Sequence, residues 1–241
     1  MIVSIANQKG GSAKSTTAAA LAQAAAHSGK KTLAIDLDPQ GNLSFFLAAN
    51  TARAGSFELM EGQPAAEVIQ HTEDGIDVIA ASWNLQTISS YKGSARRLRT
   101  ALEPAAEYDL IFIDTPPTAG ELQYNALMAS DQLIIPLQAD IGGLQGLYQM
   151  ADTAKKIQQG NPALTLTGFI LTRHGGRSTL ARQMTETIKE RAAEMQIPFL
   201  IAIREAVAIR EAQTLQRSLY KYAPNSKPAA DYMQLLEELT K

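Results

Sequence analysis

Short apolar segments without polar alternation constrain the fold of this chain more than any other feature. They occupy residues 2–6, 32–37, 76–80, 110–114, 132–137, 166–172 and 198–203. A strand that is apolar at successive positions must be covered on both faces, as central strands of a parallel sheet are. Helical patterns separate several of these segments, at residues 14–28, 95–107, 207–217 and 229–239. The alternation predicts an α/β fold with a doubly wound, mostly parallel sheet flanked by helices.

Length and composition narrow the class of protein further. The 241 residues contain no internal repeat and no low-complexity linker, so we expect one domain over residues 1–241, with residues 48–70 as an irregular surface excursion. Cysteine is absent, which excludes disulfides, thiolate zinc sites and iron–sulfur clusters. No apolar segment approaches the roughly 20 residues that span a bilayer, and no basic leader is visible. We therefore expect a cytoplasmic protein.

A glycine-rich turn joins the first predicted strand to the first predicted helix. Residues 9–16 are Lys-Gly-Gly-Ser-Ala-Lys-Ser-Thr. Backbone N–H groups and the helix dipole make such a turn a site for phosphate. Lys14 can reach β- and γ-phosphate oxygens, and the Ser15 hydroxyl can bind Mg²⁺. Gln8 and Ala13 stand where the standard G-x-x-x-x-G-K-[ST] pattern has glycine, so the bare pattern alone leaves a structural glycine turn as the alternative. If Ala13 needs a positive φ, alanine costs about 1 kcal/mol.

Three aspartates lie at the ends of predicted strands. Asp36 lies near the end of the apolar segment 32–37, and Asp38 follows that segment directly. Asp114 ends the segment 110–114. The carboxyl ends of parallel strands form the ligand-binding edge of such a sheet. Residues two apart on a strand share a side, so Asp36 and Asp38 are both expected to face the glycine-rich turn. An aspartate that ends an apolar strand is typical of a Walker B segment, whose carboxylate holds Mg²⁺.

Together these segments resemble a known family. Residues 5–16, Ile-Ala-Asn-Gln followed by the glycine-rich turn, resemble the deviant Walker A box of the ParA/MinD superfamily of P-loop ATPases, and most of all its Soj-like ParA members. Residues 36–42, Asp-Leu-Asp-Pro-Gln-Gly-Asn, resemble the second motif of that family. Thr115-Pro116-Pro117 resembles the segment after its Walker B strand. The resemblance is specific up to about residue 147 and thinner beyond it.

The resemblance implies a Mg²⁺-dependent ATPase that hydrolyses ATP slowly without a partner. It implies that ATP is bound by Lys9, Gly10, Gly11, Ser12, Ala13, Lys14, Ser15 and Thr16. It implies that Mg²⁺ is bound by Ser15, Asp36 and Asp114, and that Lys9, Lys14 and Asp38 are catalytic. In the family, the lysine at the position of Lys9 reaches phosphates in the partner of a homodimer. The aspartate at the position of Asp38 orients the attacking water.

The charge distribution predicts a second surface. Residues 173–227 contain ten Lys and Arg against five Asp and Glu, although the chain has a net charge of −2. Residues 221–227, Lys-Tyr-Ala-Pro-Asn-Ser-Lys, resemble a basic element of the family. The resemblance implies non-specific DNA binding by the ATP-bound dimer and a nucleoid-associated location. It also implies a ParB-like adaptor protein. The candidate DNA-binding residues are Arg204, Arg210, Arg217, Lys221 and Lys227.

Two other functions remain as alternatives. A MinD-like ATPase ends in a basic helix that lies on lipid. Residues 231–241 carry three acids and one lysine, which anionic lipid would repel. A metabolic P-loop enzyme, such as one resembling dethiobiotin synthetase, has a related fold, but Lys9 and residues 36–42 fit the partition group better. The absence of cysteine excludes a reductase resembling the nitrogenase iron protein. The cargo and the adaptor are not encoded in any motif.

Overall fold

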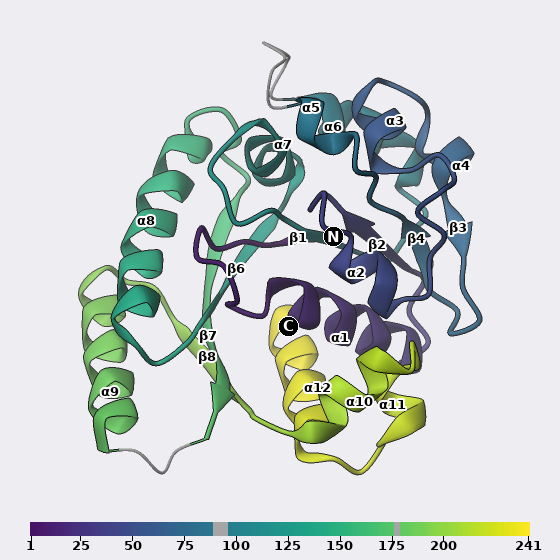
Figure 1. The fold of residues 1–241 in the computed structure, drawn as a ribbon. Coiled ribbons are helices and arrows are strands. Elements are labelled where there is room, and N and C mark those ends of the chain that lie inside the picture. Colours follow the sequence, from purple (N-terminus) through teal and green to yellow (C-terminus); the bar gives the residue numbers. More distant parts are fainter. Residues whose placement is uncertain (89–95, 176–178) are drawn as a thin grey trace.

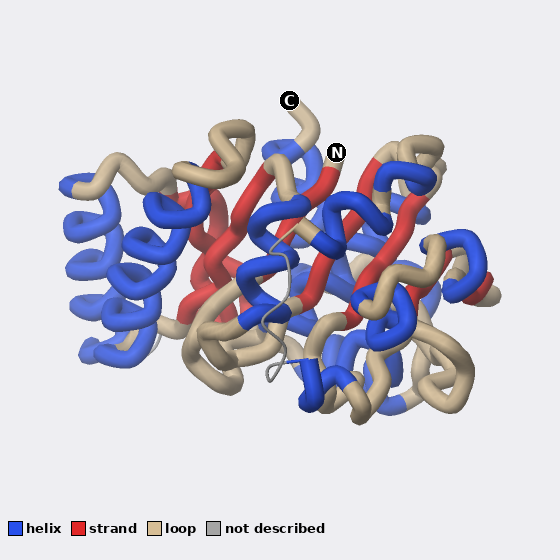
Figure 2. Tube along the Cα trace, turned by 90° about the horizontal axis from the view of Figure 1, so that it is seen from above, coloured by secondary structure: helices blue, strands red, loops and turns tan. Residues whose placement is uncertain are grey.

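A computed structural model describes residues 1–88, 96–175 and 179–241. Its described residues form one eight-stranded sheet with the order β3-β4-β2-β5-β1-β6-β7-β8 (Figures 1 and 2). β3 pairs antiparallel with β4, and the other neighbouring strands pair in parallel. The predicted doubly wound, mostly parallel sheet is confirmed. The strands are β1 (Ile2–Ile5), β2 (Thr32–Asp36), β3 (Gln70–His71), β4 (Asp77–Ile79), β5 (Leu110–Asp114), β6 (Gln132–Leu137), β7 (Thr165–His174) and β8 (Phe199–Arg204).

Helices cover both faces of this sheet (Figure 1). On one face lie α1 (Lys14–His27), α2 (Asn42–Phe46), α10 (Val207–Thr214), α11 (Leu219–Tyr222) and α12 (Lys227–Leu239). On the other lie α3 (Ser56–Met60), α4 (Ala65–Val68), α5 (Leu85–Ile88), α6 (Arg97–Ala101), the 3₁₀ helix η1 (Glu103–Ala105), α7 (Glu121–Ala129), α8 (Ile141–Gln158) and α9 (Thr179–Glu194). Within the described residues, no helix has the length and apolar character needed to cross a membrane.

Burial on both faces explains why the strands lack polar alternation. In β5, Phe112 packs into the core beneath α1 and α12, while its neighbour Ile113 packs into the core beneath α6 and α7. Both side chains are fully buried. Successive residues of a strand point to opposite faces, so a strand covered on both sides needs apolar residues at every position.

Two predicted features differ from the structure. The helix predicted over residues 95–107 is replaced by α6 and η1, and Pro104 lies in the 3₁₀ segment, where a proline has no N–H to continue an α-helix. Residue 95 lies outside the described residues. The prediction of an irregular surface excursion over residues 48–70 is confirmed for residues 48–54, which are irregular and mostly exposed, but it is wrong for the rest of the segment, because Leu59, Met60 and Val68 are buried in the core. The helices of this segment, α3 and α4, have five and four residues, which is too few for a periodic apolar pattern to be recognised in the sequence.

The sheet topology brings the predicted functional segments together. Strand order reverses at β1, which lies between β5 and β6. Ligands of doubly wound sheets bind at the carboxyl ends of strands beside such a reversal. Asp114 pairs in register with Ile5 on one side and with Asp36 on the other. The ends of β1, β2 and β5 therefore lie next to one another, although they are far apart in sequence.

The packing of residues 48–70 predicts a stability effect. We expect Gly55→Ala to lower the free energy of unfolding by about 1–3 kcal/mol, because its Cβ would lie 2.1 Å from the backbone oxygen of Ala80. A chain of this size should then lose about 2–4 °C of melting temperature per kcal/mol. Gly120→Ala is the matched control, since a Cβ there meets nothing within 4 Å. Equal melting temperatures for the two variants would show that Gly55 is not closely packed.

Candidate functional site

The glycine loop, residues 9–16 between β1 and α1, exposes its backbone donors. Outside groups lie against its carbonyl oxygens. The Gln138 side chain donates to Gly11 O at 2.8 Å, and the Thr172 hydroxyl, which has one proton to donate, lies 3.2 Å from Ser12 O and 3.1 Å from Leu137 O. Among the described residues, no partner accepts a hydrogen bond from the backbone N–H groups of residues 10–16. Unpaired N–H groups at a helix N-terminus form a binding site for an anion.

Ala13 has the left-handed conformation that the sequence analysis considered. Its φ is +67° and its ψ is +33°, at the N-cap of α1. Gly11 is also left-handed, with φ +74°. A β-carbon in this region clashes with the following carbonyl, which costs about 1–2 kcal/mol. The chain thus keeps the loop conformation at Ala13 without the glycine that favours it.

Lys14 is a buried cation without an ion-pair partner among the described residues, at 6% exposure. Burial lowers the pKa of its ammonium group, and the negative charges of Asp114 and Asp38 act in the opposite direction. A desolvated ammonium group is stabilised when an anion comes into contact with it. The side chain begins at the first residue of α1, beside the unpaired N–H groups.

Asp114 is a buried carboxylate with free oxygens. Both oxygens lack a hydrogen-bond partner of good geometry among the described residues. Burial raises the pKa of Asp114 well above its usual value, and the charge of Asp36 raises it further, while the Ser15 hydroxyl and Lys14 act against the rise. Such an orphaned carboxylate, with a serine hydroxyl beside it, is a suitable donor set for a divalent cation that keeps several waters.

Asp36 is equally buried, but its oxygens are occupied. It accepts hydrogen bonds from the backbone N–H and the hydroxyl of Ser44, and from the Asp38 N–H. Burial raises its pKa to about 6, and the hydrogen bonds from Ser44 oppose that rise. Asp36 therefore fixes α2 and the turn that follows β2. Asp38 lies in that turn, where its carboxylate accepts from the Gln40 N–H.

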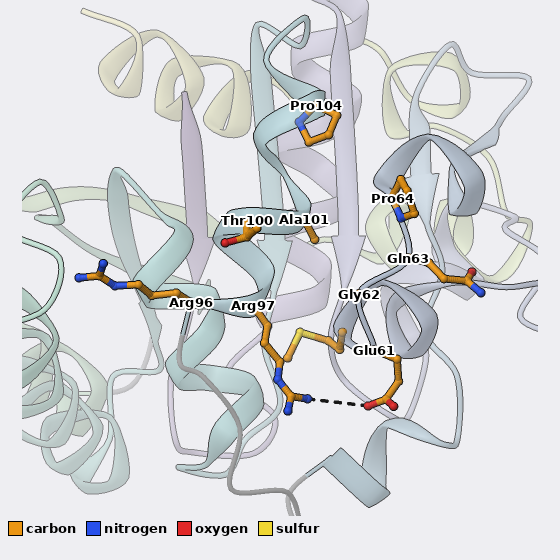
Figure 3. Close-up of a pocket in the computed structure, with 10 residues that line it drawn as sticks. Glu61, Gly62, Gln63, Pro64, Arg96, Arg97, Thr100, Ala101 and Pro104 are labelled. Atoms are coloured by element: carbon orange, nitrogen blue, oxygen red, sulfur yellow. Dashed lines mark ion pairs between the residues drawn. The ribbon is translucent and has the colours of Figure 1, made fainter.

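These groups surround a cavity of about 320 Å³, the loop cavity. Its lining includes Lys14, Asp38 and Pro117 as well as most of the glycine loop. A side cavity of about 130 Å³ adjoins it, and both share Ala13 and Thr16. A larger cavity of about 590 Å³ lies between α6 and the α3–α4 connection (Figure 3), and it contains none of the predicted site residues.

Lys9 does not line the loop cavity of its own chain. Its ammonium group lies 2.6 Å from Asp140 at the N-cap of α8. Asp140 also accepts a hydrogen bond from the Gly143 N–H. Burial acts to raise the pKa of Asp140, but the hydrogen bonds from Lys9 and Gly143 lower it below its usual value. In this structure Lys9 thus points toward α8, away from Lys14.

The five predicted DNA-binding residues fall into two groups. Arg204 and Lys221 are held by carboxylates: Arg204 by Asp231, and Lys221 by Asp74 at 2.6 Å. The other group is exposed and forms no ion pair within the described part of the chain; it comprises Arg210, Arg217 and Lys227. Residues 173–227, the basic segment, contact the glycine loop directly, because the Gln213 amide of α10 donates to Thr16 Oγ1 at 3.1 Å.

Comparison with known proteins identifies the family. The family model of an AAA domain matches residues 1–166. The chromosome-partitioning ATPase Soj of Thermus thermophilus is 35% identical over 239 residues, which cover 98% of this chain and 94% of Soj. The chain belongs to the Soj/ParA family of P-loop ATPases. The family predicted from the glycine loop and from residues 36–42 is confirmed.

Solved structures of related ATPases share the fold. The ATP complex of a McdA variant from Cyanothece has a TM-score of 0.88 and 25% identity, and covers 99% of this chain and 96% of McdA. Cobyrinic acid a,c-diamide synthase of Mycobacterium smegmatis, with an ATP analogue and magnesium, has a TM-score of 0.85, 28% identity and coverages of 99% and 93%. MinD of Pyrococcus horikoshii with Mg-ADP has a TM-score of 0.81, 27% identity and coverages of 100% and 96%.

Sequence reasoning missed the side chains that support the glycine loop from outside. Gln138 and Thr172 bind its carbonyl oxygens, and Gln213 binds Thr16. Gln138 and Thr172 come from the carboxyl ends of β6 and β7, which pair with each other, and Gln213 comes from α10. A polar residue at the carboxyl end of a strand signals in general that it lies at the ligand-binding edge of the sheet. The choice of partner depends on strand order, which the sequence did not give.

The strained loop residue leads to a prediction. We expect Ala13→Gly to raise the free energy of unfolding by about 0.5–1 kcal/mol, because relief of strain at φ +67° outweighs the added entropy of the unfolded chain. Thermal unfolding without ligand measures the change. Gly62→Ala is the inverse control, since Gly62 has φ +102° and alanine there should destabilise. A lower melting temperature for Ala13→Gly would contradict strain at this position.

Removing a buried carboxylate should stabilise the ligand-free chain. Folded Asp36 and Asp114 have raised pKa values, so the folded state binds more protons and stability falls as pH rises from about 4 through about 6. We expect Asp114→Asn to be more stable than the parent at pH 7 by about 1–3 kcal/mol, and by less at pH 4. Denaturant unfolding at both pH values measures this. Exposed Asp152→Asn is the control. A destabilised Asp114→Asn at pH 7 would contradict the orphaned carboxylate.

Proposed function

We propose that this chain binds ATP with Mg²⁺ in the loop cavity and hydrolyses it to ADP and phosphate. The unpaired N–H groups of residues 10–16 would bind phosphate oxygens, and Lys14 would neutralise their charge. The free oxygens of Asp114 and the Ser15 hydroxyl fit the donor set of a magnesium site. Family membership and the ligands named for the cobyrinic acid synthase and MinD structures support this proposal.

The chemistry requires mainly position and charge from the protein. Lys14 and the loop N–H groups stabilise negative charge on the transferred phosphoryl group. Asp38 lines the same cavity, and its backbone is fixed by the turn to Gly41, so its carboxylate is in place to orient the attacking water. Magnesium, held by Ser15 and Asp114, supplies further positive charge at the phosphate oxygens when bound. Asp36 supports this arrangement by anchoring α2 and the turn.

Lys9 is proposed to act in the loop cavity of a partner subunit rather than in that of its own chain. Lys9 lies outside the loop cavity of its own chain and is paired with Asp140 on the surface, with both side chains partly exposed. An exposed ion pair contributes little to stability and exchanges readily for another anion. In an ATP-bound homodimer, Lys9 would leave Asp140 and bind a phosphate in the partner subunit. Hydrolysis would then depend on the dimer.

DNA binding is proposed for the exposed arginines of the basic segment. The observation that carries this proposal is the Gln213–Thr16 hydrogen bond, which ties α10 to the helix that begins at the glycine loop. Thr16 lines the loop cavity, so a single hydrogen bond joins the lining of that cavity to α10, which carries Arg210 and precedes Arg217. Lys227 at the start of α12 adds a third exposed cation. Arg204 and Lys221, each paired with a carboxylate, would contribute less than predicted from the sequence.

The two alternatives are less well supported. The apolar face of α12, with Tyr232, Leu235 and Leu239, is buried against the protein and is not available for lipid. The cobyrinic acid synthase neighbour shows that a metabolic enzyme has a similar fold, but its 28% identity is below the 35% of Soj. We therefore propose a location at the nucleoid, where a ParB-like adaptor would stimulate hydrolysis and a cargo would be positioned.

One experiment tests the nucleotide-gated DNA surface. Binding to a non-specific DNA duplex is measured without nucleotide, with ADP, with ATP and with a non-hydrolysable ATP analogue, at two salt concentrations. We expect salt-sensitive binding only with ATP or the analogue. Arg210→Ala and Arg217→Ala should each weaken binding and lower the salt slope by about one for each phosphate contact removed. Light scattering of the same samples should show a dimer with the analogue, and a monomer when Lys9 is replaced by alanine.

The control variants distinguish the loss of a DNA contact from a general loss of positive charge. Lys30→Ala removes an exposed charge at the opposite end of α1 and should bind DNA as the parent does. Lys221→Ala should have a smaller effect than Arg217→Ala, because Asp74 already holds Lys221. DNA binding without nucleotide, or equal losses for Lys30→Ala and Arg217→Ala, would reject the gated surface. Binding to anionic vesicles instead of DNA would favour the membrane alternative.

A further inference from the structure

Arg173 has a backbone conformation that arginine rarely adopts. It lies near the carboxyl end of β7 with φ +51°, in the left-handed region. Non-glycine residues in this region are strained, and they persist where surrounding structure holds them, often at functional sites. No motif of the sequence singled out Arg173. Its position at the ligand-binding edge of the sheet is decided by the strand order.

Two features hold Arg173 at the glycine loop. The preceding residue, Thr172, has its hydroxyl within hydrogen-bonding distance of Leu137 O in β6, at 3.1 Å, and of Ser12 O, at 3.2 Å. The pairing of β7 with β8 shifts register between Leu171 and His174. Such an irregularity redirects a side chain away from its regular strand position. Thr172 and Arg173 lie within this irregularity, and Arg173 is the one with the left-handed backbone.

Arg173 borders the space around the glycine loop. It lines the loop cavity together with Lys14 and Asp38, and it lines the side cavity together with Thr16 and Gln213. Of the described residues around the loop cavity, Lys14 and Arg173 are the cations. Within the described residues, the guanidinium forms neither an ion pair nor a hydrogen bond. It is therefore available to a ligand.

The chemistry of this position favours phosphate. A guanidinium binds two phosphate oxygens at once with charge-assisted hydrogen bonds. Loop N–H groups hold the α- and β-phosphates in proteins of this kind, while the loop lysine reaches the β- and γ-phosphates. Ala13 and Thr16 line both cavities, as Arg173 does. Arg173 thus shares two cavities with the part of the loop that leads into α1.

We propose that Arg173 is a second cation of the nucleotide site, contributed in cis, that binds the α- or β-phosphate. This inference rests on the proposed binding of ATP in the loop cavity. It assigns to this chain a positive charge that does not come from a partner subunit. Arg173 would therefore strengthen the binding of a diphosphate and of a triphosphate alike, in the monomer as well as in the dimer. Lys9 would act only across the dimer.

Calorimetric binding of ADP, the non-hydrolysable ATP analogue and adenosine tests this proposal. We expect Arg173→Ala to weaken ADP and the analogue alike, by about tenfold to a hundredfold. Adenosine, which has no phosphate, should bind both proteins equally. Arg173→Lys should recover part of the affinity, because it keeps the charge and loses the bidentate contact. Arg53→Ala, which removes an exposed arginine elsewhere, is the control and should bind as the parent does.

The outcomes are distinct. Unchanged affinity of Arg173→Ala for ADP would overturn the inference while leaving the proposed function intact. Loss of affinity for the triphosphate analogue alone would place the contact at the γ-phosphate and reject the assignment. Equal loss for adenosine, or a ligand-free melting temperature lowered by more than about 2–4 °C, would indicate a structural effect. A parent protein that binds neither nucleotide would reject the nucleotide site and Arg173 with it.

Discussion

Hydrogen bonds to the outer side of the glycine loop are the interaction on which the rest of the site depends. Gln138 and Thr172 bind the carbonyl oxygens of Gly11 and Ser12, while the N–H groups of residues 10–16 have no partner within the part of the chain that the structure describes. Ala13 accepts a left-handed backbone to complete the turn. Backbone donors at a helix N-terminus that have no partner in the protein are open to water or to an anion. This arrangement supports the phosphate binding that we propose for the loop.

The buried charged residues of the site carry a free-energy cost in the ligand-free chain. Lys14, Asp36 and Asp114 lie together at the ends of α1, β2 and β5, and burial lowers the pKa of the lysine and raises those of the aspartates. A core of this kind is less stable than an apolar one of the same shape. The surrounding sheet compensates, because its strands are apolar on both faces and are covered by helices. Asp36 satisfies its oxygens within the chain, whereas Asp114 keeps its oxygens free.

The contact between Gln213 and Thr16 gives the nucleotide site a physical connection to the basic segment. α10 contacts α2 as well as α11, so the elements around the cavity form one packed group with α1 and α12. Ion pairs sort the basic residues within this group. Arg204 and Lys221 are held within the fold by Asp231 and Asp74, whereas the exposed Arg210 and Arg217 form no ion pair among the described residues. Charge counted along the sequence could not make that distinction, because the acidic partners of Arg204 and Lys221 are distant in sequence.

The sequence by itself determined the sheet class, the segments of the parallel strands, the glycine loop and the family, because apolar runs and a contiguous loop motif are local signals; the short antiparallel β3 was not predicted. It also indicated that Asp36, Asp38 and Asp114 gather at one edge, since parallel strands end on the same side. It did not reveal the burial of Leu59, Met60 and Val68, which lie in helices too short to show a clear period, nor the break near Pro104. Only the tertiary structure decided which carboxylate is free, where Lys9 points and how Arg173 reaches the loop. Each of these depends on strand order, register and long-range hydrogen bonds, which join residues that no local pattern connects.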